Sequence, residues 1–249
     1  MAASVIIAAA LTVLATVLGG FVALRAKDRL HLVLGLSGGV LLGLVAFELI
    51  PETFELNNNT ALGLPAVMVA FVAGFLLLHI LERSAGVHEP ADSDYGSHSH
   101  SHPRVGWLGA GGLALHSFID GVGIGLGFQI SHQVGIAVAV AVLAHDFTDG
   151  LNTVTLMVRS GNDRRNAIRM LALDAVAPAL GVLSTLLFTL PDSALGLYLG
   201  AFAGFLTYLA AADILPEAHS RHPSRLTLVS TLIGVAVMGA VVAVAVSMN

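Results

Sequence analysis

The chain has 249 residues, of which 56% are hydrophobic and 11% charged, and its formal net charge is -5 with histidine neutral. Because soluble domains carry about 25% charged residues, this composition excludes an ordinary soluble globular protein. The chain contains no cysteine, which excludes disulfides and thiolate metal ligands, and we expect no nucleic-acid partner.

The apolar residues fall into blocks of about 20 residues or more, the length that a helix needs to cross about 30 Å of hydrocarbon. We therefore predict an all-α polytopic membrane protein in which residues 1–249 form a single transmembrane domain. The eight predicted spans cover residues 3–24, 32–54, 62–82, 106–130, 133–158, 166–190, 194–215 and 226–248. Residues 1–24 lack a charged n-region and a clear cleavage site, so they are predicted to be a span and not a signal peptide.

All 11 lysine and arginine residues lie in or beside alternate connections between these spans. They are Arg25, Lys27, Arg29, Arg83, Arg104, Arg159, Arg164, Arg165, Arg169, Arg221 and Arg225. Because basic residues collect in cytoplasmic loops, the pattern predicts that both termini are extracytoplasmic, in a plasma (inner) membrane. An incorrect number of spans would have scattered these charges over both faces.

The second predicted span contains ELIPE, from Glu48 to Glu52, near its outer end. Taken alone, this segment is equally typical of an ordinary interfacial helix end. His79, near the inner end of the third span, is predicted to snorkel or to cap a helix, and His132 is predicted to be exposed in a short outer loop.

Residues 83–105 form the longest polar connection, which is predicted to be a disordered cytoplasmic loop. The loop contains SHSHSH, in which His98, His100 and His102 alternate with serine. Such a tract could bind a divalent metal weakly and transiently, and the alternative is a solvated linker.

HSFIDG and HDFTDG lie near the centres of the fourth and fifth spans, and each places a histidine and an aspartate four residues apart on one helical face. A charge at the centre of a membrane helix costs about 2.5–3.5 kcal/mol, so these groups must face one another, water or an ion. Imidazole and carboxylate together suit zinc, iron(II) and similar metals. The predicted ligands between these two helices are His116, Asp120, His145 and Asp149. A histidine satisfied by its aspartate for helix association alone is the alternative, which two copies of the motif disfavour.

Further polar side chains accompany these motifs. Asp146 adds a carboxylate beside the second pair, and Ser117 occupies the matching position in the first. Asp174 is a lone carboxylate in the sixth span. Two roles are open for it: completing a second metal position, or pairing with Arg169 or Arg165 near the interface.

The seventh span contains DILPE, from Asp213 to Glu217, which repeats the pattern of ELIPE. The second and seventh spans run in opposite directions, as do the fourth and fifth, so the repeated motifs have the inverted topology of many secondary transporters. Pro51 and Pro216 are predicted to loosen or kink their helix ends. The paired acids are predicted to form funnels that concentrate cations at the two mouths of a pathway: Glu48, Glu52, Asp213 and Glu217.

The chain resembles the Zrt/Irt-like (ZIP) divalent-metal transporters over essentially its whole length. The resemblance rests on the eight spans, the histidine-bearing loop after the third span, HSFIDG and HDFTDG, and the seventh-span segment GAFAGFLTYLAAADILPEAH. It implies a paired metal site, with Ser117 and Asp146 at secondary positions and Asp120 and Asp149 bridging. It also implies zinc as the main transported metal, with iron, manganese or cadmium as others. It further implies alternating access toward the cytoplasm, by one helix bundle sliding against the other, and often a homodimer.

Several positions depart from the pattern of that family. Its usual asparagine is Ser117 here, a poorer ligand, and aspartate replaces the frequent glutamate at Asp120 and Asp149. The glutamate that often precedes a proline in the sixth span is Ala177, and Asp174 lies one turn earlier as a possible substitute. These changes leave the primary site credible and weaken the case for the secondary one.

Two other functions are compatible with intramembrane His/Asp pairs. An intramembrane zinc-dependent hydrolase would use them to activate water, but the inverted pairing of ELIPE with DILPE has no obvious use in an enzyme. A cation-diffusion-type metal exporter also carries such pairs, but generally has six spans and a soluble carboxy-terminal domain. We therefore expect a transporter that is not an enzyme and holds no prosthetic group, with the metal as its substrate.

Overall fold

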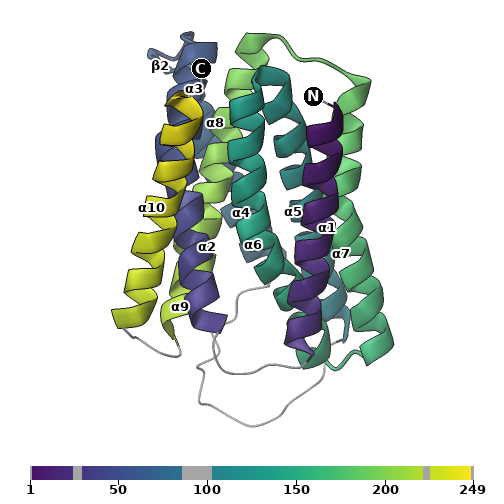
Figure 1. The fold of residues 1–249 in the computed structure, drawn as a ribbon. Coiled ribbons are helices and arrows are strands. Elements are labelled where there is room, and N and C mark those ends of the chain that lie inside the picture. The colour runs from purple at the N-terminus through teal and green to yellow at the C-terminus, as the bar shows by residue number, and fades with distance from the viewer. Residues whose placement is uncertain (1, 25–29, 86–102, 221–224, 248–249) are drawn as a thin grey trace.

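The computed structural model describes residues 2–24, 30–85, 103–220 and 225–247, which form an antiparallel bundle of helices (Figure 1). The α-helices are α1 (Ala2–Ala23), α2 (Leu30–Leu44), α3 (Ile50–Leu56), α4 (Ala66–Ala85), α5 (Pro103–Ile130), α6 (His132–Arg159), α7 (Arg164–Ser184), α8 (Asp192–Tyr208), α9 (Leu215–Ser220) and α10 (Arg225–Ser247). The remaining elements are the π-helices η1 (Val45–Leu49) and η3 (Leu209–Ile214), the 3₁₀-helix η2 (Thr185–Leu187), and the strands β1 (Thr60–Ala61) and β2 (Leu64–Pro65).

The predicted all-α membrane architecture is confirmed. Within the described residues, seven helical stretches are long and apolar enough to cross a membrane, and α4 adds a shorter apolar stretch from Ala66 to Leu81. One crossing joins α2, η1 and α3, and another joins α8, η3 and α9. Eight helical segments therefore cross the bundle.

Two predicted boundaries are wrong. The third span was expected to begin at residue 62, but Leu62 and Gly63 have φ of 54° and 77° in the turn between β1 and β2. A right-handed helix cannot include residues with positive φ, so the helix cannot begin at residue 62, and α4 begins at Ala66. The sixth span was expected to reach residue 190, but α7 ends at Ser184, where the chain tightens into η2.

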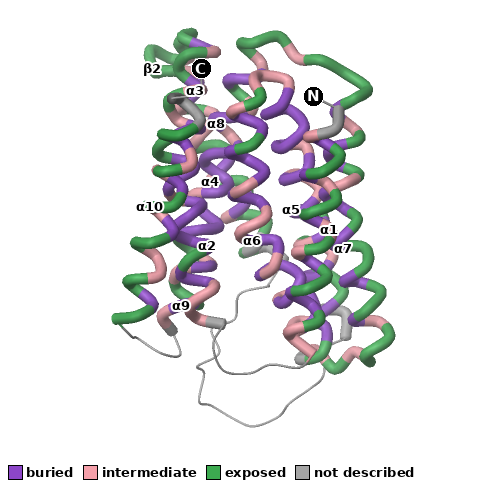
Figure 2. Tube along the Cα trace, viewed as in Figure 1, coloured by how far each residue is buried: buried purple, intermediate pink, exposed green. Residues whose placement is uncertain are grey.

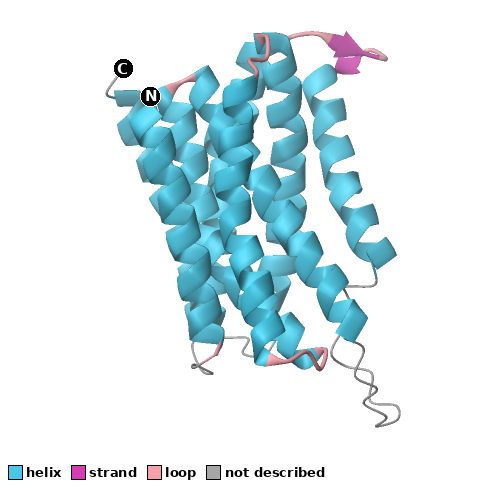
Figure 3. Cartoon of the chain, turned by 90° about the vertical axis from the view of Figure 1, so that its right-hand side faces the viewer, coloured by secondary structure: helices cyan, strands magenta, loops and turns pink. Residues whose placement is uncertain are grey.

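The described helix ends that carry arginine all lie on one side of the bundle. Arg83 is in the last turn of α4, and Arg164 and Arg225 begin α7 and α10. The first and last helices have their free ends on the opposite side (Figure 3). The predicted histidine tract at residues 98–102 lies outside the described residues.

The helices form two groups of four. In the first group, α1 and α5 pack on α6, and α7 packs on α1 and α5. In the second group, α2 packs on α10 and α4 packs on α8. The two groups meet mainly where α2 contacts α6, and buried residues are concentrated in the interior of the molecule (Figure 2).

Each group contains two close helix crossings at which both helices contribute a glycine that faces the backbone of the other helix. At each crossing, a Cβ on either glycine would collide with the backbone of the facing helix, so only glycine allows this approach. The four pairs are Gly19 with Gly150, Gly121 with Gly181, Gly39 with Gly234, and Gly74 with Gly204. Gly121 and Gly150 directly follow Asp120 and Asp149, so the last residue of each His/Asp motif fixes its helix against a neighbour.

The structure supports the predicted inverted repeat in the second and seventh spans. A π-turn precedes each motif proline: the Ile50 N–H donates to Val45 O, and the Leu215 N–H donates to Ala210 O. Both donors lie one residue before a proline, which itself has no N–H to continue the α-helical ladder. The prolines therefore widen the helix locally at equivalent positions, and the chain continues as α3 and α9.

Candidate metal centre

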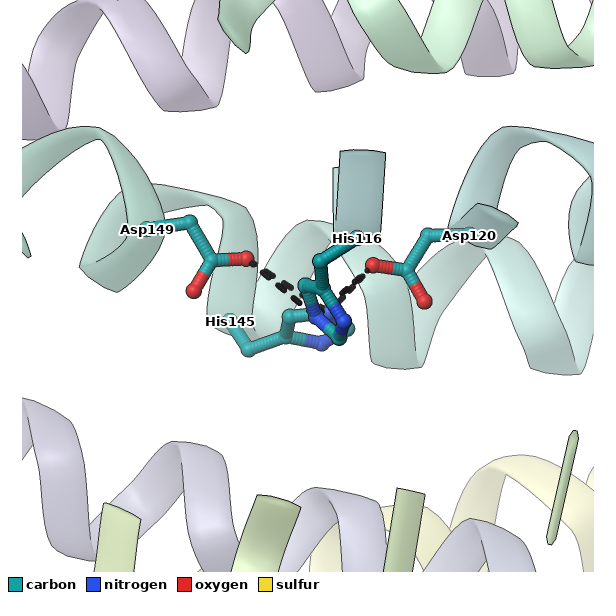
Figure 4. Close-up of side chains that lie close together, drawn as sticks. All are labelled: His116, Asp120, His145 and Asp149. Carbon is teal, nitrogen blue, oxygen red and sulfur yellow. Dashed lines mark hydrogen bonds and ion pairs between the residues drawn. The ribbon is translucent and has the colours of Figure 1, made fainter. Parts of the chain in front are cut away.

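The two His/Asp motifs meet between α5 and α6. His116 and Asp120 lie one turn apart on α5, and His145 and Asp149 lie one turn apart on α6, so each helix presents both side chains on one face. All four residues are at most 6% exposed. Each offers one ligand atom, and these atoms all lie within 4.8 Å of one another (Figure 4).

The separations between these atoms fit a small metal ion. Asp120 Oδ2 lies 3.0 Å from His116 Nε2 and 3.2 Å from His145 Nε2. Asp149 Oδ2 lies 3.8 Å from each of the same nitrogens. Ligand atoms around a tetrahedral zinc are about 3.3 Å apart, as bond lengths of about 2.0–2.1 Å require. The donor set would therefore need only small movements to close around one ion.

His145 is oriented by its own helix. Its Nδ1 lies 2.9 Å from the carbonyl oxygen of Ala141. A carbonyl only accepts hydrogen bonds, so Nδ1 carries the proton and, in the neutral ring, Nε2 has a free lone pair. That lone pair faces carboxylate oxygens, an arrangement that repels unless a proton or a metal ion lies between them.

Several buried acceptors of this region have no hydrogen-bond partner. They are Asp120 Oδ1, Asp149 Oδ2 and both carboxylate oxygens of Asp146. An unpaired buried carboxylate is costly, because it loses hydration without gaining a donor. Asp146 lies next to His145 in the sequence and is fully buried. The excess of negative oxygens over donors is a property that a cation would compensate.

Asp174 is held by hydroxyl groups from two neighbouring helices. Ser117 Oγ donates to Asp174 Oδ1 at 2.7 Å, and Thr153 Oγ1 donates to Asp174 Oδ2 at 2.8 Å. Neither arginine of the alternative pairing reaches Asp174: Arg169 donates to Asn166, and Arg165 is exposed in the first turn of α7. Asp174 is fully buried and close enough to Asp146 to act on it electrostatically. The structure thus brings the predicted secondary residues together beside the four-ligand cluster.

The four acids of the ELIPE and DILPE segments lie toward opposite ends of the molecule. Glu48, in η1, is 5% exposed, and its carboxylate lies beside Gln133 at the start of α6. Glu52 is half-buried in α3. Asp213, in η3, is close enough to act electrostatically on His116 and Asp149.

At the far end of that series, Glu217 is exposed in α9. The acids therefore extend from the four-ligand cluster toward both ends of the bundle.

Three contacts that the sequence did not indicate reach the cluster from the second helix group. The ring of Phe205, on α8, stacks on His116. Ser37 Oγ, on α2, donates to the carbonyl oxygen of Ala144, the residue before His145. The hydroxyl of Tyr198, on α8, donates to the carbonyl oxygen of Ile119, the residue before Asp120, at 3.3 Å. These partners lie far apart in the chain, and no sequence motif marks them.

Two other histidines are accounted for separately. His79 was expected to snorkel or cap a helix, but it lies half-buried with its Nδ1 3.2 Å from the Tyr208 hydroxyl. The aromatic neighbour on α8 explains this difference. His132 is exposed, as predicted, but it is the first residue of α6 and does not lie in a loop.

Known proteins share this sequence pattern. The family model described as ZIP Zinc transporter matches residues 84–242. The zinc transporter ZupT of Corynebacterium aurimucosum is 25% identical, and the match covers 90% of this chain and 91% of the relative. ZupT of Corynebacterium glutamicum is 29% identical over 90% of this chain and 92% of its own. The zinc transporter YKE4 of Saccharomyces cerevisiae is 28% identical over 86% of this chain and 72% of its own.

Proposed function

The chain belongs to the ZIP zinc transporter family, and we propose that it carries zinc across the membrane through the four-ligand cluster between α5 and α6. It is an integral membrane transporter of divalent metal and not an enzyme. Iron(II), manganese and cadmium are further candidate substrates, because imidazole and carboxylate ligands accept several of these metals. The metal is the transported substrate, and no prosthetic group is part of the proposal.

The proposal rests mainly on four buried metal-ligand atoms that lie close together, beside carboxylate charge that no hydrogen-bond donor fully compensates. Nε2 of His116 and His145 and Oδ2 of Asp120 and Asp149 converge within 4.8 Å, and two of these carboxylates have an oxygen without a hydrogen-bond partner. Without thiolates, the cluster binds zinc less tightly than a structural Cys site would. A carrier needs this balance, because it must release the ion that it strips of water.

The acids at the two ends of the bundle support a route for the ion. Glu48 and Glu52 would attract cations at the outer mouth, and Asp213 and Glu217 would receive them at the inner mouth. We propose transport toward the cytoplasm in a plasma membrane, with both termini extracytoplasmic. The arginines that begin and end helices on one side support this orientation by the positive-inside rule.

The division into two helix groups supports alternating access. The first group carries all four ligands on α5 and α6, and glycine crossings tie these helices to α7 and α1. A group held by such close backbone contacts can move as one body against the other, which would expose the cluster first to one mouth and then to the other. Assembly as a homodimer, with the second group anchored, is compatible with this movement.

A second metal position beside the first is part of the proposal. Asp146 offers two unpartnered oxygens, and Ser117 and Asp174 are linked to each other next to it. Asp120 and Asp149 would bridge the two positions. The loop at residues 83–105, with its histidine tract, would bind the released metal transiently on the cytoplasmic side.

Metal uptake into proteoliposomes tests the proposal. Zinc, iron(II), manganese and cadmium would be offered to the wild type, to His116→Ala and Asp149→Asn, and to matched controls. His132→Ala and Asp192→Asn serve as controls, because both residues are exposed and lie outside the cluster. We expect saturable uptake that is lost in the first two variants and kept in the controls. Uptake that survives both cluster substitutions would refute the proposed route.

A further inference from the structure

The two histidines of the cluster are held by different means. His145 is fixed by the bond between its Nδ1 and the carbonyl oxygen of Ala141 in its own helix. Within the described residues, no hydrogen bond orients the His116 ring, whose Nε2 lacks a partner in hydrogen-bonding geometry. His116 Nε2 does lie 3.0 Å from Asp120 Oδ2 on its own helix, but this contact involves the nitrogen that would bind the metal. The repeated motifs thus give one ligand whose other ring nitrogen is hydrogen-bonded to its own helix and one ligand without such a bond.

The His116 ring instead rests on an aromatic ring from the other helix group. Phe205 stacks on it with ring centroids 4.8 Å apart and an angle of 19° between the planes. Phe205 is 6% exposed. Phe202 is the next ring in the series and stacks on Phe205, with ring centroids 6.4 Å apart and an angle of 15° between the ring planes. Tyr198 continues the series by stacking on Phe202 at 5.9 Å and 12°. A rotation of the imidazole about its χ angles would therefore meet a ring that is itself supported.

We propose that Phe205 is the positioning residue of His116, which holds the imidazole with Nε2 turned toward the metal cluster. The inference rests on the proposed function, because it assumes that the cluster binds the transported ion. Phe205 belongs to α8, whereas His116 belongs to α5, so the orientation of this one ligand depends on where the two helix groups lie relative to each other. His145 carries no such dependence.

For transport, this contact would link the relative position of the two helix groups to the affinity of the cluster for the metal ion. When the ligand-bearing group moves against α8, the stacking surface under His116 is lost, and the ring gains the freedom to rotate away from the ion. The site then keeps three oriented ligands where it had four. Affinity would fall with the movement itself, which favours release at the second mouth.

The test is a double-mutant cycle on metal binding by the full-length protein in lipid nanodiscs, with Co²⁺ as the probe. Its visible ligand-field absorption reports the coordination geometry, and titration gives the affinity. Phe205→Leu removes the ring, and Phe205→Tyr keeps it. Residues that orient metal ligands typically contribute about 10–100-fold to affinity, so we expect at least a tenfold loss in Phe205→Leu and near-normal binding in Phe205→Tyr.

The cycle separates positioning from a general packing effect. In a His116→Ala background, Phe205→Leu should change neither the remaining affinity nor the spectrum, because the ligand that it orients is gone. In a His145→Ala background, the same substitution should still weaken binding. Phe128→Leu is the control, since Phe128 is a buried phenylalanine on α5 that contacts His132 and no ligand.

The possible failures can be told apart. If Phe205→Leu binds Co²⁺ as the wild type does, or loses the same affinity with and without His116, Phe205 does not position that ligand and the inference is wrong. If the affinity and spectrum are the same in the wild type, His116→Ala and His145→Ala, the cluster is not the metal site, and the proposed function falls together with the inference.

Discussion

Asp149→Asn should stabilise the metal-free protein while it removes the stabilisation that metal provides. Asp149 is 2% exposed, and its Oδ2 has no hydrogen-bond partner. The shorter contacts with both imidazoles belong to Asp120, at 3.0 and 3.2 Å, whereas Asp149 lies 3.8 Å from each. Its charge is therefore the less compensated of the two, and asparagine keeps the shape without that charge.

The magnitude follows from the cost of leaving a buried polar group unpaired, about 1–3 kcal/mol and more for a charged group. Asparagine remains polar, so we expect the free energy of unfolding of the metal-free protein to rise by about 1 kcal/mol. For a protein of this length, that corresponds to an increase of about 2–4 °C in Tm. In the wild type, metal at about 100 times its Kd should add about 2.7 kcal/mol, and in Asp149→Asn much less.

Asp174→Asn provides the matched comparison with the opposite sign. Asp174 is equally buried, but both of its oxygens accept hydroxyl hydrogen bonds, from Ser117 and Thr153. Hydrogen bonds to a charged group contribute about 1.5–3 kcal/mol each, so neutralising this carboxylate should lower Tm. Tm would be measured by thermal unfolding in detergent, in chelator and in zinc. A lower Tm for Asp149→Asn in chelator, or equal stabilisation of variant and wild type by zinc, would show that Asp149 carries no uncompensated charge that metal neutralises.

Three further predictions concern the packing around the cluster. Gly150→Ala should destabilise the protein by about 1–3 kcal/mol through overpacking, whereas Gly112→Ala, with open space around it, should raise Tm slightly; equal shifts would contradict the glycine crossing. Ser37→Ala removes a hydrogen bond between the two helix groups and should change the rate of zinc uptake without changing Co²⁺ affinity; an altered affinity would contradict a purely interfacial role. Pro216→Ala restores a backbone N–H, so hydrogen exchange in η3 should slow as the π-turn becomes α-helical, and unchanged exchange would contradict the role of the proline.

The four-ligand cluster was predictable because its information is local. An i, i+4 spacing fixes two side chains on one face, and the repetition of the motif on consecutive antiparallel spans makes the two faces meet. The inverted repeat was predictable for the same reason, since ELIPE and DILPE show it directly. The span count followed from hydropathy and from the one-sided arginines.

The remaining features depend on contacts between distant segments. The sequence left Asp174 with two possible roles, and it could not indicate the hydroxyl groups of Ser117 and Thr153, which hold the carboxylate from neighbouring helices. The stacking of Phe205 on His116 is equally invisible, because a phenylalanine on an apolar helix is ordinary. The late start of α4 follows from the positive φ at Leu62, which a leucine rarely adopts.

X-ray absorption at the zinc edge of the zinc-loaded protein tests most directly whether His116, Asp120, His145 and Asp149 hold the ion. We expect nitrogen and oxygen ligands at about 2.0–2.1 Å, with outer-shell scattering from two imidazoles in the wild type and from one in His145→Ala. His132→Ala should give the wild-type spectrum. A spectrum without imidazole scattering in the wild type, or one that His145→Ala leaves unchanged, would contradict the assignment of the metal centre.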